Sequence, residues 1–122
     1  MIKTISTKEL KKMLDLKEEF KLIDVLDSEH YRKEHIPNAI SLPLNELRKK
    51  AKNVLNKDEK IVVYCASFEC EASTKAVKIL QSLGYKNVLD YKGGLKDYRE
   101  NGLALAGKLH ETHFHALSCK NC

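Results

Sequence analysis

The stretch that most constrains the fold is a short apolar run that ends in a cysteine and a polar loop. Residues 61–64 (Ile-Val-Val-Tyr) are apolar or aromatic without interruption, and Cys65 follows directly. A continuous run of this length, bounded by loop signals, is typical of a strand buried on both faces of a sheet. From Thr74 onward the apolar residues recur at helical spacing until Gly84, which stands where a C-cap glycine belongs. The pattern predicts a central strand that leads through a loop into a helix.

The rest of the chain alternates between strand and helix signals. A capping box, Ser6 with Glu9, opens a first helix, and Asp27 or Ser28 can cap a second. Pro43 can open a weak helix that ends in the basic run 48–50. We expect further strands near residues 2–5, 20–26, 40–42 and 87–89, and a last helix over 95–100. This alternation predicts an α/β fold with a mainly parallel sheet and helices on both faces.

Composition excludes several classes of protein. The 122 residues suffice for one domain, and a hydrophobic share of 43% argues against disorder of the whole chain. The formal charge of +5 is spread among interspersed acids, so we expect no nucleic-acid partner. No apolar run reaches the length of a membrane span, and the first residues have no signal-peptide core. We therefore expect a cytoplasmic protein with no membrane association, whose four cysteines stay reduced.

Cys65 is the candidate nucleophile. It is expected at the carboxyl end of a central strand and just before a helix, which is the crevice where open α/β sheets carry out chemistry. Loop amides and the helix amino end would favour a thiolate there and lower the pKa of Cys65. The alternative is a small buried side chain that only packs. Asp24, inside an apolar strand, needs hydrogen-bond donors, so it either braces a loop or shapes the active site.

Four motifs follow one another along the chain. They are Leu-Ile-Asp-Val at 22–25, His-Ile-Pro-Asn-Ala at 35–39 followed by Ile-Ser-Leu-Pro, Val-Val-Tyr-Cys at 62–65, and Gly-Gly at 93–94 before a short helix. In this order they resemble the rhodanese-like domain. The resemblance covers about residues 2–104, so we place the domain at 1–104 and a C-terminal tail at 105–122. It implies the rhodanese fold, with a five-stranded parallel sheet flanked by helices.

The resemblance also implies a sulfurtransferase that needs no cofactor. Its active-site cysteine, which maps to Cys65, carries sulfane sulfur as a persulfide. The donor would be a polysulfide, thiosulfate or the persulfide of a partner protein, and a thiophilic acceptor would take the sulfur. The loop that would bind the sulfur is Ala66, Ser67, Phe68, Glu69, Cys70, Glu71 and Ala72, through its inward amides. Oligomeric state does not follow from the sequence.

This loop departs from the family pattern in its charge. Ala72 stands where an arginine usually lies near the loop end, and Glu69 and Glu71 are acidic. Two acids would raise the thiol pKa and repel a doubly charged anion. We therefore predict poor thiosulfate turnover and a preference for less charged or protein-borne sulfur. Tight phosphate binding is not expected, because the loop itself holds no cation.

Cys70 shares the loop with Cys65. One interpretation is a resolving thiol, which attacks the Cys65 persulfide, releases sulfide and leaves a disulfide. The other is a small residue packed in the loop beside Phe68. The spacing alone does not decide between them, because a disulfide needs specific geometry.

The tail 105–122 has a different composition from the rest of the chain. His113, His115, Cys119 and Cys122 are candidate zinc ligands, since Cys-Lys-Asn-Cys has the spacing of half a structural zinc site. A solvated, disordered terminus is the interpretation we favour, so we assign no metal.

Two functions from different classes remain open at this stage. The first is the single-domain sulfurtransferase acting through Cys65. The alternative is a low-turnover, rhodanese-like sulfur-carrier or protein-binding module that recognises a partner protein. The acidic loop and the missing arginine keep the alternative open.

Overall fold

The computed structural model describes residues 2–110 of the chain. Within that part, five strands alternate with helices. The strands are β1 (Lys3–Thr4), β2 (Lys21–Asp24), β3 (Ile40–Ser41), β4 (Ile61–Tyr64) and β5 (Val88–Tyr91). The helices are α1 (Thr7–Asp15), α2 (Ser28–Lys33), the 3₁₀ turn η1 (Leu44–Glu46), α3 (Leu47–Val54), α4 (Ala72–Ser82) and α5 (Gly94–Glu100).

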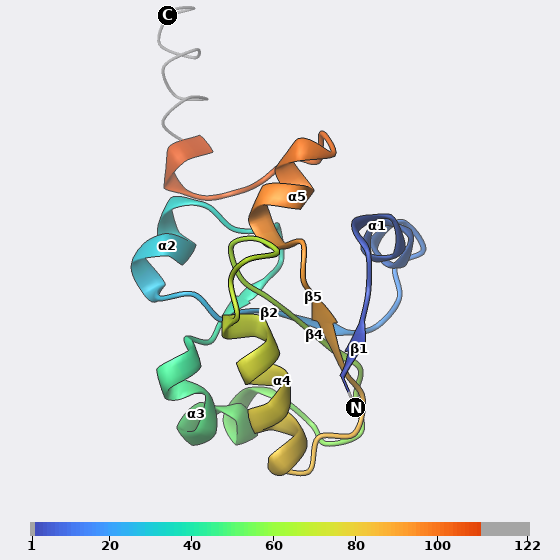
Figure 1. Ribbon diagram of the computed structural model, residues 1–122, viewed down its shortest axis with the longest axis vertical. Coiled ribbons are helices and arrows are strands. Elements are labelled where there is room, and N and C mark those ends of the chain that lie inside the picture. Colours follow the sequence, from blue (N-terminus) through green and yellow to red (C-terminus); the bar gives the residue numbers. More distant parts are fainter. Residues whose placement is uncertain (1, 111–122) are drawn as a thin grey trace, which may run out of the picture.

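The strands form one sheet in the order β1-β5-β4-β2-β3, and every neighbouring pair is parallel. β4 therefore lies at the centre, between β5 and β2, as its continuous apolar sequence predicted. Figure 1 shows this sheet between two sets of helices. The predicted five-stranded parallel sheet with flanking helices is confirmed.

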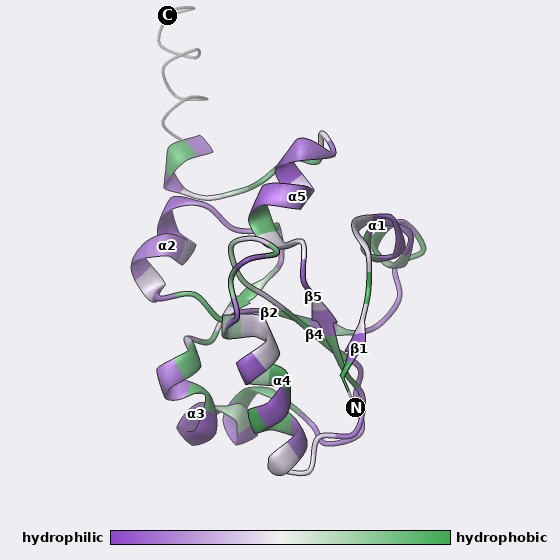
Figure 2. Ribbon diagram, viewed as in Figure 1, coloured by the Kyte–Doolittle hydropathy of each residue, from purple (hydrophilic) through white to green (hydrophobic). Residues whose placement is uncertain are grey.

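Each face of the sheet is covered by its own helices and has its own core. Ile61 and Val63 of β4 pack with side chains of α3 and α4, while Val62 and Tyr64 pack with side chains of α1 and α5. This alternation follows from the two-residue period of a strand. All four side chains are fully buried. Figure 2 shows hydrophobic and hydrophilic residues mixed along helices such as α4.

Short sequence signals set several helix ends as predicted. The Ser6 hydroxyl accepts the Glu9 N–H at 3.1 Å, and the Glu9 carboxylate accepts the Ser6 N–H at 2.9 Å, which completes the capping box of α1. Asp27 caps α2 by accepting the N–H of His30 at 2.9 Å. Gly84, just after α4, has a φ of +96°, which a residue with a Cβ adopts only at a cost.

Two elements extend further than the sequence predicted. α3 continues through the basic run to Val54, because Leu47, Ala51 and Val54 fall on one helical face and pack against the core. β5 extends to Tyr91, because the polar residue within it, Asp90, is buried where Thr74 can bond it. Contacts with distant parts of the chain therefore decide where α3 and β5 end, and the local sequence does not reveal these contacts.

Residues 103–110 lie against the body. Leu105 is buried, and Ala106 pairs with His35 through two backbone hydrogen bonds of 2.8 and 2.9 Å. The domain boundary at 104 stays a prediction, and most of the tail lies outside the described residues. Among residues 2–110, no helix combines the length and apolar character needed to cross a membrane.

Candidate active site

The candidate site is the loop that joins β4 to α4 at the carboxyl end of the central strand. Cys65 follows Tyr64 directly, and α4 begins at Ala72, so the predicted loop of residues 66–72 is nearly all loop in the structure. The start of α5 fixes its beginning, since the N–H of Leu95 donates to the Cys65 carbonyl at 3.1 Å and that of Lys96 to the Ala66 carbonyl at 2.9 Å.

Gly94 permits this close approach. Its φ is +62°, and a Cβ at this position would lie 2.3 Å from the Cys65 carbonyl oxygen. Real Cβ atoms do not come so close to a backbone oxygen. The second glycine of the Gly-Gly pair therefore lets α5 press against the peptide that carries the candidate nucleophile.

Cys65 is sealed inside the protein, with an exposed fraction of 0%. Its S–H donates to the backbone carbonyl of Cys70 at 3.4 Å. Burial raises the pKa of the Cys65 thiol, and the interaction with the Cys70 side chain adds to this, although the hydroxyl and N–H of Ser73 favour the thiolate. The expectation of a lowered pKa at Cys65 is therefore wrong, because loss of water outweighs the few donors that face this sulfur.

Cys70 is the less buried of the two thiols, and both are free. Burial by itself would raise its pKa, but the Cys65 thiol and the backbone N–H groups of Ala66 and Ala72 outweigh that effect. The charge of Lys92 acts in the same direction, and the pKa of Cys70 is lowered. The structure thus brings the two cysteines of the loop together, since the Cys65 S–H reaches the Cys70 carbonyl.

Lys92 is a site residue that the sequence analysis missed. It follows β5, and its Nζ donates to the Cys70 carbonyl and to Thr74 Oγ1, both at 3.2 Å. Thr74 in turn donates to Asp90 Oδ2 at 2.9 Å, and Asp90 is only 1% exposed. The loop itself lacks a cation, but a neighbouring strand end supplies one. The only local signal was a lysine at the predicted end of a strand, just before two glycines.

The acidic residues of the loop do not act as expected on the thiols. Glu69 and Glu71 are exposed, and neither is among the groups that shift the pKa of Cys65 or Cys70 most. The backbone N–H of Glu69, the Ser67 side chain and Lys96 lower the pKa of the Glu69 carboxyl. The two acids therefore contribute negative charge at the rim of the loop, while burial is the main cause of the raised pKa of Cys65.

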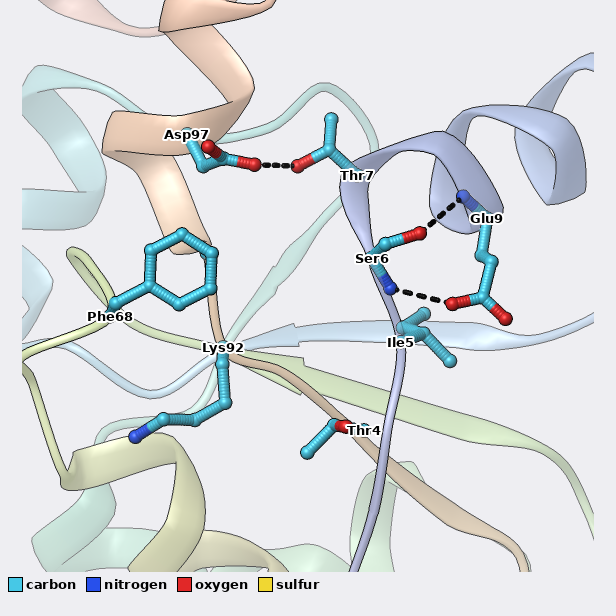
Figure 3. A pocket seen from close by; sticks show the side chains of 9 residues that line it. Thr4, Ile5, Ser6, Thr7, Glu9, Phe68, Lys92 and Asp97 are labelled. Atoms are coloured by element: carbon cyan, nitrogen blue, oxygen red, sulfur yellow. Dashed lines mark hydrogen bonds between the residues drawn. The ribbon is translucent and has the colours of Figure 1, made fainter.

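A pocket of about 410 Å³ opens beside the loop. Figure 3 shows Phe68 and Lys92 on one side and the segment from Thr4 to Glu9 on the other. Thr7 of that segment donates to Asp97 of α5, which ties the two walls together. Phe68 is 60% exposed, so the loop presents an aromatic ring at the mouth of this pocket.

Asp24 braces the end of β2. It is fully buried, and its Oδ1 accepts the N–H of Leu26 at 2.9 Å. Burial raises the pKa of Asp24, although the N–H of Leu26 and the side chain of Tyr64 act to lower it. The sequence left two roles open for Asp24, bracing a loop or shaping the active site. Its bond to the Leu26 N–H favours bracing of the turn that follows β2.

The zinc candidates His113, His115, Cys119 and Cys122 lie outside the described residues. Within residues 2–110, no cluster of three or more His, Cys, Asp or Glu side chains has the arrangement of a metal site.

Comparison with known proteins gives one consistent family. The sequence matches the model of the Rhodanese-like domain over residues 6–101. "Thiosulfate sulfurtransferase PspE" of Escherichia coli (strain K12) is 40% identical over 76 residues, which cover 62% of this chain and 70% of PspE.

Two further relatives extend the match. "Putative sulfur carrier protein YrkF" of Bacillus subtilis (strain 168) is 33% identical over 97 residues, 80% of this chain and 51% of YrkF, so the chain spans about half the length of that relative. The solved structure of the rhodanese-like domain from the Anabaena sp. protein Alr3790 matches with a TM-score of 0.82 at 32% identity, and covers 90% of this chain and 83% of that one.

Proposed function

The chain belongs to the rhodanese-like domain family, and from this premise we propose that it moves sulfane sulfur through a persulfide on Cys65. Relatives named as a sulfurtransferase and as a sulfur carrier support sulfur transfer in general. The observation that carries the proposal is the position of Cys65, at the carboxyl end of the central strand, where the loop leads into α4 and the N–H and hydroxyl of Ser73 face its sulfur.

The chemistry is a double displacement at sulfur. A thiolate attacks the outer sulfur of the donor, the donor's S–S bond breaks, and its remaining thiolate leaves. The persulfide is then attacked by an acceptor thiol, which regenerates the cysteine. Ser73 supplies an N–H and a buried hydroxyl at Cys65, and the hydroxyl has no hydrogen bond that would compete. These donors can stabilise negative charge on the sulfur as it is released.

The charges around the loop support a preference for neutral or protein-borne sulfur. Lys92 and Lys96 are cations beside the loop, whereas Glu69 and Glu71 are exposed at its rim and Glu9 and Asp97 line the adjacent pocket. A doubly charged donor such as thiosulfate would approach several carboxylates before it reached Lys92. We therefore propose a low-molecular-weight or protein-bound persulfide as the better donor, in a reducing compartment such as the cytosol.

Cys70 is proposed as a resolving thiol for the Cys65 persulfide. Its attack on the inner sulfur would release sulfide and leave a Cys65–Cys70 disulfide. The 3.4 Å contact between the Cys65 sulfur and the Cys70 carbonyl oxygen, together with the effect of each thiol on the pKa of the other, supports this role. A Cys70→Ser variant should then hold the Cys65 persulfide longer, and an unchanged lifetime would rule the role out.

A low-turnover sulfur carrier or protein-binding module is the second candidate function. Two observations favour it, the complete burial of Cys65 and the exposed ring of Phe68 at the mouth of the pocket. Such a module would accept sulfur but release it to a small thiol only slowly.

One experiment separates the two functions. The protein is incubated with glutathione persulfide, its intact mass is recorded, and a small acceptor thiol is then added. A sulfurtransferase gains one sulfur atom that is lost rapidly to the acceptor, and a variant without Cys65 and Cys70 shows only the background uptake by Cys119 and Cys122. A carrier gains sulfur but keeps it. No gain of sulfur at either cysteine would exclude both.

A further inference from the structure

The burial of Cys65 makes a direct encounter with a sulfur donor difficult. Its exposed fraction is 0%, and its S–H is already engaged with the Cys70 carbonyl at 3.4 Å. An attacking thiol must be both deprotonated and accessible. Cys65 meets neither condition in this conformation, although family resemblance assigns the persulfide to it.

Cys70 meets both conditions better. It is only partly buried, and it lies five residues further along the same loop. The backbone N–H groups of Ala66 and Ala72, at the two ends of the loop, act on its sulfur. Two backbone N–H groups of the loop therefore favour negative charge on the Cys70 sulfur.

Lys92 adds a fixed cation at this position. Its Nζ is held 3.2 Å from the Cys70 carbonyl oxygen and 3.2 Å from Thr74 Oγ1. Thr74 is itself tied to the buried carboxylate of Asp90, which limits where the ammonium group can move. Cys70 thus combines partial exposure, amide donors and a nearby positive charge.

We propose that sulfane sulfur enters the loop on Cys70 and reaches Cys65 by a second transfer inside the loop. This inference rests on the proposed function and assigns the first step to a different residue. Cys65 then acts as the internal acceptor, whose persulfide is protected from water by the same burial that keeps donors away from its thiol.

Both steps balance without an added oxidant or reductant. First, the Cys70 thiolate attacks the outer sulfur of a persulfide donor R–S–SH, the donor's S–S bond breaks, and the R–S⁻ that leaves takes up a proton. Second, Cys65 attacks the outer sulfur of the Cys70 persulfide, and its proton passes to the Cys70 sulfur, which is the leaving group. The products are the Cys65 persulfide and the Cys70 thiol, and the number of sulfane sulfur atoms is unchanged.

The test compares four proteins under a limiting amount of glutathione persulfide. They are the wild type, Cys65→Ser, Cys70→Ser and the double variant, which reports the sulfur taken up by Cys119 and Cys122 of the tail. Samples are quenched with an alkylating reagent at short times, and the added sulfur is measured by intact mass. Circular dichroism verifies that each variant is folded.

Sulfur should appear on Cys65→Ser as fast as on the wild type. It should appear on Cys70→Ser at least about tenfold more slowly, because attack depends on thiolate fraction and access. The opposite pattern, with no uptake by Cys65→Ser and a wild-type rate for Cys70→Ser, would overturn the proposal but leave the proposed function intact. Uptake by none of the proteins above the double variant would contradict the proposed function itself.

Peptide mapping of the wild type gives a second readout that needs no substitution. Glu69 lies between the two cysteines, so a protease that cleaves after glutamate separates them. The earliest alkylated persulfide should be found in the fragment with Cys70 and only later in the fragment with Cys65. The reverse order would exclude entry at Cys70.

Discussion

Replacing Gly94 by alanine tests how the start of α5 holds the candidate loop. Gly94 has a φ of +62°, and an added Cβ would lie 2.3 Å from the Cys65 carbonyl oxygen and 2.9 Å from the Ala66 carbonyl carbon. Backbone atoms at these distances have to move, and that movement breaks or stretches the 3.1 Å hydrogen bond between the Leu95 N–H and the Cys65 carbonyl.

The expected loss of stability has two parts. Left-handed backbone costs an L-residue about 1–2 kcal/mol, and a weakened buried hydrogen bond costs about 1 kcal/mol more. The sum of roughly 2–3 kcal/mol corresponds to a fall in Tm of about 10 °C for a domain of this size.

Gly102→Ala is the matched control. Gly102 has a φ of +77°, but a Cβ there would have no heavy atom within 4 Å, so this variant isolates the conformational cost. Thermal unfolding followed by circular dichroism should show a smaller fall in Tm, about 4–8 °C. Gly94→Ala should also speed the alkylation of Cys65 in the folded protein, because the loop is displaced. Equal falls in Tm and an unchanged alkylation rate would refute the account of the contact between α5 and the loop.

Three further predictions follow from single contacts. Burial raises the pKa of Asp24, so the folded state binds a proton more tightly than the unfolded state, and stability falls as the pH rises above the ordinary Asp range. Asp24→Asn should flatten this decline when the free energy of unfolding in urea is measured over about pH 4 to 7. An equally steep decline in the variant would contradict the role of Asp24. Burial alone would raise the pKa of Cys70, but the charge of Lys92 is among the interactions that lower it. Lys92→Met should therefore move the pH profile of Cys70 alkylation to higher pH, while Lys92→Arg should preserve it. Coincident profiles would speak against a role for the charge. Ser6→Ala should lower the stability of the domain by about 1 kcal/mol in thermal unfolding, because the capping box of α1 is lost, and no change would show that the box does not stabilise the helix.

The features that the sequence predicted well are those encoded by neighbouring residues. The apolar run of β4 indicated a strand buried on both faces, and it is the central strand of the sheet. The capping box of Ser6 and Glu9 is complete, and Gly84 has the positive φ that a helix terminus favours. In each case the deciding interaction spans only a few residues of the chain.

The features that the sequence did not predict depend on contacts between distant segments. The position of Lys92 beside the loop follows from the pairing of β4 with β5, which brings residues far apart in sequence to one edge of the sheet. The raised pKa of Cys65 follows from complete burial, which a cysteine next to a polar loop does not reveal. The end of α3 at Val54 was missed because packing, and not helix propensity, extends that helix.

The central claim is that sulfur passes through the cysteines of this loop, and labelled sulfur tests it most directly. A persulfide donor that carries a heavy isotope in its outer sulfur is mixed with an acceptor thiol and a catalytic amount of protein. The account predicts that the label reaches the acceptor much faster with the wild type than with the variant in which Cys65 and Cys70 are both serine. Equal rates of label transfer with the two proteins would contradict it.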